Sequence, residues 1–211
     1  MKIISPSFEI LTPLDGQAIL KHIELCGRVC YKSEDKITDT SAAAFVAGII
    51  KRGHEAVLEH YDITVKFICD RGVSHELVRH RLAPTVKKAP ATATTPKTDL
   101  RRNHCHLALF SVKREHRHAA LGVGLPPGGG VLFQHAHLCC TPQEARSVLP
   151  NSLKTEVVMT ANLREWRHFF KLRTAPAAHP QMRELAIPLL RRMQEMVPVV
   201  FDDLEVAHEK S

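Results

Sequence analysis

Residues 79–81 read Arg-His-Arg, which places two guanidinium groups on either side of an imidazole. A guanidinium presents a fork of donors that matches a phosphate, or the oxygens of a carbonyl-rich ring, with two parallel hydrogen bonds. The triplet therefore predicts an anion-binding site. Because three-residue motifs recur by chance, a solvated basic turn is the alternative interpretation.

A second polar cluster contains two histidines, His54 and His60, with glutamates between them. A helical zinc motif needs histidines four residues apart, and the residue four positions after His54 is Leu58. We therefore expect no metal site here, and expect polar groups at an interface or at the edge of a cofactor instead.

A third cluster lies near the C-terminal end of the chain and combines arginines with an amide and an imidazole. Asn162, Arg164 and His168 follow one another at spacings that can share one side of a helix. Such a stripe predicts either a binding surface or an ordinary solvated face. Arg146 and Arg173 add two more guanidinium groups to this part of the chain.

Alternating and helical apolar patterns indicate the elements that must position these groups. Asp15 can cap an amphipathic helix over 16–31, and residues 61–69 alternate like a strand. Ser74 can cap a helix that carries Glu76 to Arg81 and so includes the Arg-His-Arg triplet. The other expected elements are a strand within 1–13, helices from 40, from 141, over 162–172 and over 179–197, and an extended stretch over 153–159. The last helix should kink or break at Pro188.

The stretch from residue 84 to about 140 differs from the rest in charge and in pattern. It holds eight basic and two acidic side chains, so most of the net charge of +7 belongs to it. Proline and glycine clusters interrupt it and no apolar period runs through it. So long an irregular connection is unusual inside a compact domain.

Composition limits the class of protein. Apolar residues make up 44% of the 211 residues, which is typical of a globular chain, and no apolar run is long enough to cross a membrane. We expect one soluble domain over residues 1–211, located in the cytoplasm. Six cysteines without C-x-x-C spacing are expected to be reduced thiols.

Five segments, in the same order along the chain, resemble the flavin-dependent thymidylate synthase family. The resemblance covers about residues 1–83 and 141–206. Single motifs are modest, but five in the right order are specific. They are Cys26–Tyr31, Gly53–His60, His75–Arg81, Gln143–Pro150 and Asn162–Arg173.

The resemblance implies an α+β fold, a sheet with packed helices, whose middle segment is disordered or misfolded here. It implies synthesis of dTMP from dUMP, with methylenetetrahydrofolate as one-carbon donor, FAD as cofactor and NADPH as co-substrate. A homotetramer is implied, without a nucleic acid or membrane partner. Arg173 is the implied catalytic residue. The implied flavin residues are His54, Glu59, Arg79, His80, Arg81, Asn162, Arg164 and His168, and the implied nucleotide residues are Glu76, Arg79, Arg146 and Arg173.

The chain departs from the family pattern after Ala83. The family continues with Ser-Tyr-Ser-Gln-Glu-Ser-x-Arg-Tyr, whereas this chain has Lys87 and Lys88 in place of Gln-Glu, Ala89 in place of a serine and Ala91 in place of an arginine. One allowed spelling of residues 84–91, CCT ACA GTC AAG AAA GCA CCC GCT, reads Ser-Tyr-Ser-Gln-Glu-Ser-Thr-Arg once a T is placed in front. We therefore interpret residues 84 to about 140 as an out-of-frame translation.

Because the replaced groups bind nucleotide and flavin in the family, we expect weak or no activity from this chain. Two alternatives stay open. The chain could be an inactive, oligomer-forming remnant of the enzyme, or a relative that binds RNA through its basic middle segment. A flavin absorbance spectrum separates the remnant from a working enzyme, and steeply salt-dependent RNA binding would favour the second alternative.

Overall fold

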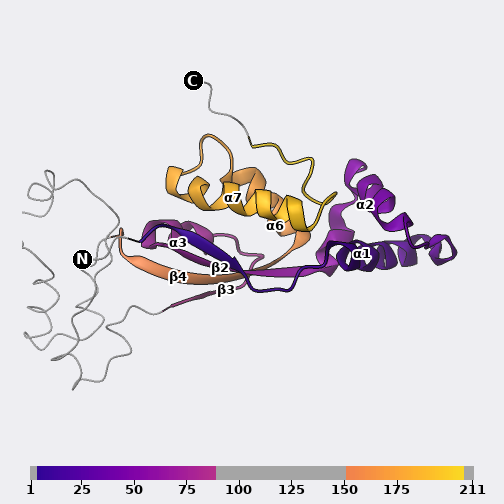
Figure 1. The fold of residues 1–211 in the computed structure, drawn as a ribbon, viewed down its shortest axis with the longest axis horizontal. Helices are drawn as coiled ribbons and strands as arrows, with labels where there is room; N and C mark the ends of the chain where they lie inside the picture. The colour runs from indigo at the N-terminus through magenta and orange to yellow at the C-terminus, as the bar shows by residue number, and fades with distance from the viewer. Residues whose placement is uncertain (1–3, 89–150, 207–211) are drawn as a thin grey trace, which may run out of the picture. The chain divides into compact units, whose positions relative to one another are not determined.

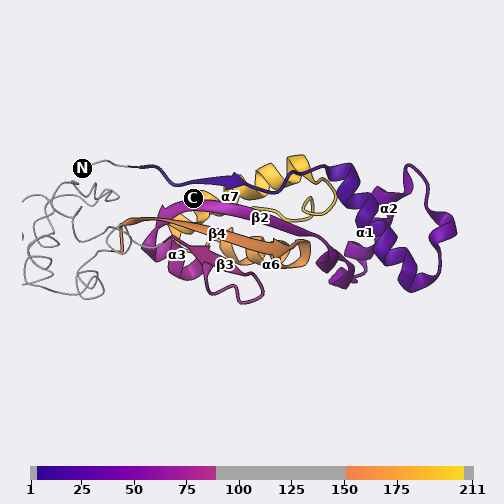
Figure 2. The same ribbon diagram turned by 90° about the horizontal axis from the view of Figure 1, so that it is seen from below.

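The computed structural model describes residues 4–88 and 151–206. Helices and a four-stranded sheet with the order β1-β2-β4-β3 make up this part of the chain, as the α+β expectation requires (Figure 2). The strands are β1 (Ser7–Ile10), β2 (Asp62–Asp70), β3 (Thr85–Lys87) and β4 (Lys154–Asn162). The α-helices are α1 (Gly16–Tyr31), α2 (Ser41–Lys51), α3 (Arg71–Leu77), α6 (Leu163–Arg173) and α7 (Pro180–Met196), with 3₁₀ turns η1 (Glu34–Lys36) and η2 (Glu55–His60).

The contacts of the chain divide it into two compact units. The larger unit contains Ser7–Phe67, Leu77–Val86 and the chain from Val158 onward, and the smaller contains Ile68–Glu76 with parts of 1–6 and 87–157. In the smaller unit, the backbone amides of Arg71 and Gly72 donate to the carbonyl of Asn151 at 2.9 and 3.4 Å.

Helix α1 confirms the expectation from the sequence. The Asp15 carboxylate accepts a hydrogen bond from the amide of Ala18 at 3.1 Å, which caps the first turn. The apolar side of the helix buries Ile19, Leu20 and Ile23. Burial of this stripe, rather than helix propensity, holds the helix against the rest of the unit.

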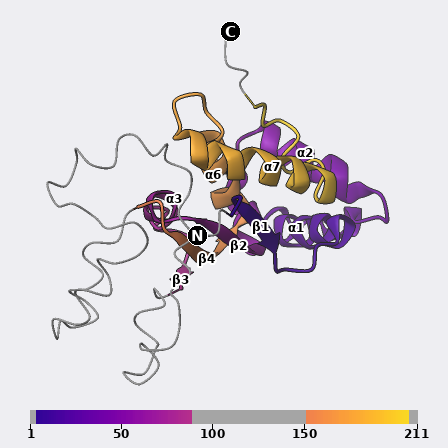
Figure 3. The same cartoon turned by 60° about the vertical axis from the view of Figure 1, so that its left-hand side comes forward.

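Helices α1 and α2 pack against each other (Figure 3). A Cβ atom on Gly27 would lie 2.6 Å from the ring of Phe45, so glycine permits the close approach. Beside this contact the buried carboxylate of Glu24 accepts hydrogen bonds from Arg28 at 2.8 Å and from the hydroxyl of Ser41 at 2.8 Å. The start of α2 is thereby tied to α1.

Helices α6 and α7 lie together over one face of the strands of the larger unit (Figure 1). The indole Nε1 of Trp166 donates to the carbonyl of Ile63 in β2 at 3.0 Å. Its ring packs against Phe67, Phe169 and Phe170 at centroid distances of 6.4, 5.3 and 5.8 Å. This aromatic cluster fixes α6, which carries most of the polar groups of the C-terminal cluster.

Three expected elements differ in the structure. Helix α3 starts before Ser74, because the carboxylate of Asp70 accepts from the amide of Val73 at 2.7 Å and caps the helix earlier. The helix also ends at Leu77, so the Arg-His-Arg triplet lies after it and not in it. Helix α7 continues through Pro188, so the expected break is absent. Strand β3 lies inside the segment that was expected to lack order.

Backbone pairing explains β3. The amide of Lys88 donates to the carbonyl of Glu156 at 2.9 Å, and the carbonyl of Pro84 accepts from the amide of Thr160 at 3.0 Å. Such pairing needs no apolar period in the side chains. Residues 89–140 and the helix expected from residue 141 lie outside the described residues. Within 4–88 and 151–206, no helix is both long and apolar enough to cross a membrane.

Candidate functional site

The Arg-His-Arg triplet forms a turn directly after α3. The amide of His80 donates to the carbonyl of Leu77 at 3.2 Å, and the amide of Ala83 donates to the carbonyl of His80 at 3.1 Å. Leu77, His80 and Ala83 are buried, whereas Arg79 and Arg81 are exposed. The turn therefore places the imidazole inside the unit and both guanidinium groups at the surface.

The buried imidazole of His80 has a partner at each ring nitrogen. Its Nδ1 lies 3.1 Å from Oε1 of Glu165, and its Nε2 lies 3.1 Å from Nε of Arg173. An arginine Nε only donates and an ionised carboxylate only accepts. The proton of the neutral ring therefore belongs on Nδ1, and Nε2 accepts from Arg173.

Burial favours the neutral form of this ring. It is the largest cause that lowers the pKa of His80 from its ordinary value, and the positive charge of Arg173 acts in the same direction. The hydrogen bond with Glu165 opposes them without reversing the shift. The ring of His168 lies 6.2 Å from that of His80, centroid to centroid, and the ring of Phe169 lies 5.0 Å away.

Helix α6 positions the C-terminal cluster. The side chain of Asn162 accepts from the amide of Glu165 at 2.8 Å and so serves as the N-cap of the helix. Residues 165 and 168 are three apart, which brings Glu165 and His168 to the same side as His80. Arg164, one residue from Glu165, points elsewhere and pairs with the carboxylate of Glu59 in η2 at 2.5 Å.

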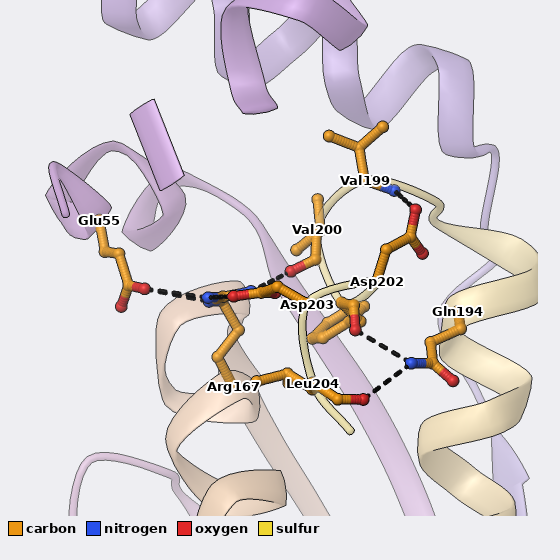
Figure 4. Close-up of polar contacts among 9 residues, drawn as sticks. Glu55, Arg167, Gln194, Val199, Val200, Asp202, Asp203 and Leu204 are labelled. Atoms are coloured by element: carbon orange, nitrogen blue, oxygen red, sulfur yellow. Dashed lines mark hydrogen bonds and ion pairs between the residues drawn. The ribbon is translucent and has the colours of Figure 1, made fainter. Parts of the chain in front are cut away.

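A buried arginine in the same helix joins α6 to two other segments (Figure 4). Nη2 of Arg167 lies 3.1 Å from Oε1 of Glu55, and the guanidinium makes two hydrogen bonds to Asp203, at 2.6 and 2.7 Å. It also donates to the carbonyl of Val200. The carbonyl of Leu204, next to Asp203, accepts from the side-chain amide of Gln194 in α7 at 3.1 Å.

The structure brings some of the implied site residues together. His80, His168 and Arg173 gather at one place, and Glu59 pairs with Arg164. His54 is exposed and its Nδ1 lies 3.0 Å from the hydroxyl of Tyr31.

The remaining implied residues of the larger unit lie at the start of α6 or on the turn after α3. The side-chain oxygen of Asn162 accepts the hydrogen bond that caps α6. Arg79 and Arg81 are exposed on the turn after α3. Glu76 lies near the end of α3 in the smaller unit, and Arg146 lies outside the described residues.

Two polar residues of this site escaped the sequence analysis, namely Glu165 and Arg167. Both are almost fully buried, at 6% and 1% exposure. Their place on the expected helix is visible in the sequence, but no local signal marks them as buried, because their partners lie far away along the chain.

The donor set suits an anionic, ring-bearing cofactor better than a metal. Within the described part of the chain, no three histidine, cysteine or acidic side chains gather as metal ligands would. The exposed guanidinium groups of Arg79, Arg81 and Arg164 suit the pyrophosphate of a dinucleotide, and Arg173 is oriented by its bond to a buried neutral imidazole. Such a group can stabilise negative charge that develops on a bound carbonyl-rich ring.

Comparisons with known proteins identify the family of the chain. The model of a family described as thymidylate synthase complementing protein matches residues 17–88 and 106–199. A protein named flavin-dependent thymidylate synthase from Mycolicibacterium gilvum is 34% identical over 218 residues, which cover 95% of this chain and 85% of that protein. A protein of the same name from Corynebacterium aurimucosum is 32% identical over 200 residues, which cover 87% of this chain and 79% of that protein.

A solved structure has a similar fold. It is a UMP/dUMP methylase, PolB, from Streptomyces cacaoi, bound with 5-Br dUMP. The TM-score is 0.68 at 18% sequence identity, and the match covers 96% of each chain. At this sequence identity, the structural similarity shows the fold of the chain alone.

Proposed function

The chain belongs to the family of thymidylate synthase complementing proteins, methyltransferase-type enzymes, and from this premise we propose that it makes dTMP from dUMP. The one-carbon donor in this proposal is methylenetetrahydrofolate, the cofactor is FAD and the reductant is NADPH. We further propose a single domain that works as a homotetramer in the cytoplasm. The relatives' shared name and the anion-suited arginines of the site support the substrate and cofactor.

Arg173 is proposed as the group that activates the nucleotide. C5 of a uracil is a weak nucleophile, and it becomes stronger when negative charge on N3 and the neighbouring carbonyl oxygens is stabilised. A guanidinium fixed beside these atoms supplies that stabilisation without reorganising during the reaction. The bond from its Nε to the buried His80 limits how the guanidinium plane can turn.

The proposed flavin residues use their charges and rings to hold the cofactor. Bound FAD would supply the hydride that completes the methyl group, and NADPH would restore the reduced flavin. Arg79, Arg81 and Arg164 would bind its phosphates, and the rings of His54 and His168 would lie against its heterocycle. The other proposed flavin residues are Glu59, His80 and Asn162.

The nucleotide phosphate calls for guanidinium groups, since these form paired hydrogen bonds with phosphate oxygens. We propose Arg79 and Arg146 for this role, with Glu76 on the nucleotide side as well. Because the sequence departs from the family pattern after Ala83, we expect the activity of this chain to be weak.

The main support for this proposal is the hydrogen bond from Nε of Arg173 to His80, which orients the guanidinium. Substitution of Arg173 tests the proposal. Arg173→Lys keeps the positive charge but loses the planar fork and the Nε donor. We expect dTMP formation to fall by about 100-fold or more, the effect of removing one preorganised charge-stabilising donor. The flavin absorbance of the purified protein should be unchanged.

The matched control is Arg192→Lys, because Arg192 is an exposed residue of α7 that pairs with Glu195 at 2.9 Å. This variant should form dTMP at the original rate. An Arg173→Lys variant that keeps full activity would contradict the proposed role. A purified chain that oligomerises, but neither retains flavin nor forms dTMP, would be the inactive remnant.

A further inference from the structure

The carboxylate of Glu165 is buried although the proposed reaction does not call for it. Its residue is 6% exposed, on the first turn of α6. An acidic residue in a first turn is often present only to complement the helix dipole. An exposed carboxylate can interact with the helix dipole equally well, so this role does not explain the burial of Glu165. Here Oε1 lies instead 3.1 Å from Nδ1 of His80.

The contact has a chemical consequence because His80 is shared. Nε of Arg173 can serve only as a donor, so the histidine must offer an unprotonated Nε2 to hold it. A neutral imidazole has a single ring proton, which must then sit on Nδ1. The carboxylate of Glu165 is placed to accept that proton's hydrogen bond.

We infer that Glu165 is a positioning residue that fixes the protonation site of His80, and through it the orientation of the Arg173 guanidinium. The Glu165–His80–Arg173 chain lies within the larger unit, and all its donor–acceptor distances are 3.1 Å. The effect of Glu165 on dTMP formation rests on the proposed function. Its effect on the His80 ring does not.

The charged and titratable groups around His80 set the pH dependence of this arrangement. Arg173 and His168 on α6 disfavour its protonation, Glu165 favours it, and burial is the largest cause of its lowered pKa. Below that pKa the ring takes a second proton on Nε2 and can no longer accept from Arg173. Activity should therefore fall on the acid side, as His80 becomes charged.

Two variants separate hydrogen bonding from charge. Glu165→Gln keeps an oxygen that can accept from Nδ1 but removes the negative charge, so the pKa of His80 should fall further. The acid limb of the activity profile should then move to lower pH. Glu165→Met keeps the length of the side chain and removes the acceptor, which leaves Nδ1 without its partner.

Heteronuclear NMR of the imidazole nitrogens reads the ring directly in the full-length protein, with the His80 signals assigned by their loss in His80→Asn. We expect the original chain and Glu165→Gln to carry the proton on Nδ1. Glu165→Met should show a mixture of the two neutral forms. Glu195→Gln, at an exposed residue of α7, is the control and should leave the signals unchanged.

Rates of dTMP formation provide the second readout. Displacing a positioned catalytic group by about 1 Å costs about 100-fold, so we expect a loss of that order in Glu165→Met and recovery in Glu165→Gln. The inference would be overturned if His80 of the original chain carried its proton on Nε2. It would also be overturned if His80 in Glu165→Met gave the same nitrogen signals as in the original chain. A changed ring with unchanged activity would overturn it as well.

The two proposals fail in distinguishable ways. If Glu165→Met does not fold in a thermal melt, the original chain and Glu165→Gln still decide the inference through the ring proton and the displaced acid limb. If the original chain forms no dTMP under any condition, the proposed function fails, while the NMR result still decides whether Glu165 fixes His80.

Discussion

Arg167 and Asp203 form a paired ion bridge, with Nη1 donating to Oδ1 at 2.6 Å and Nη2 donating to Oδ2 at 2.7 Å (Figure 4). The arginine side chain is 2% exposed and the aspartate side chain is 48% exposed. The bridge attaches α6 to the segment that follows α7. It therefore supports the helix that carries Glu165, His168 and Arg173.

This bridge predicts an acid-sensitive contribution to stability. The hydrogen bonds from Arg167 are the largest cause that lowers the pKa of Asp203 from its ordinary value of 3.8. A carboxyl whose pKa is lower in the folded state stabilises the protein above its unfolded pKa, and this contribution disappears as the pH falls through the folded pKa.

Melting temperatures of the original chain and of Asp203→Asn should therefore differ at neutral pH. The difference should shrink below about pH 4, where the unfolded carboxyl binds protons, and vanish below the lower pKa of the folded state. Asp202→Asn is the neighbouring control. The carboxylate of Asp202 accepts from the amide of Val199 at 2.8 Å, and the described structure shows no bond between it and Arg167. A difference for Asp203→Asn that persists unchanged at low pH would contradict the prediction.

The cap of α6 gives a second prediction. Because the side chain of Asn162 accepts from the amide of Glu165, Asn162→Ala should lower the free energy of unfolding by about 1 kcal/mol. Asn162→Asp and Asn162→Ser retain a capping oxygen and should keep most of the stability. Chemical denaturation measures this. If all three variants unfold like the original chain, the cap has no measurable role.

Thiol reactivity gives a third prediction. Cys69 is fully buried in β2, and burial raises the pKa of its thiol to about 12. The thiolate is the form that reacts with alkylating reagents. At pH 8 the exposed Cys30 should therefore be alkylated by iodoacetamide, while Cys69 should react only after denaturation. Peptide mass spectrometry distinguishes the sites, and fast labelling of native Cys69 would contradict its burial.

The reading frame gives a fourth prediction. The gene's nucleotide sequence over codons 84–97 should regroup, after one restored nucleotide, into Ser-Tyr-Ser-Gln-Glu-Ser-Thr-Arg-Tyr-Cys-Asn-Tyr-Thr-Lys. A chain translated from the restored frame should bind dUMP more tightly than the present one, because a guanidinium and hydroxyl groups return to the substrate side. Relatives that encode the same Lys87–Pro96 segment in an intact frame would exclude the hypothesis.

Local physics made α1 and α6 predictable from the sequence. Asp15 was expected to cap a helix over 16–31, and it caps α1. A helix was expected over 162–172, and α6 begins one residue later because Asn162 is its cap. The start of α3 was wrong because Asp70 and Ser74 are both plausible caps, and which one is used depends on how the chain leaves β2. Propensity does not distinguish between them.

The buried polar residues of α6 could not be predicted, because their partners lie far away in the sequence. Glu165 meets a histidine 85 positions earlier, and Arg167 meets an aspartate 36 positions later. Neither pairing leaves a local pattern. The helical spacing of Arg164 and His168 was visible, but it did not reveal that Arg164 pairs with Glu59.

The chain has a single tryptophan, and that residue is buried in the helix of the candidate site with its indole bonded to β2. Its intrinsic fluorescence therefore reports on α6 alone. An emission maximum at short wavelength would mean that Trp166 is shielded from water, and a red shift during unfolding would mark the moment when this helix leaves the sheet. Every variant described above carries this optical probe at no cost in labelling.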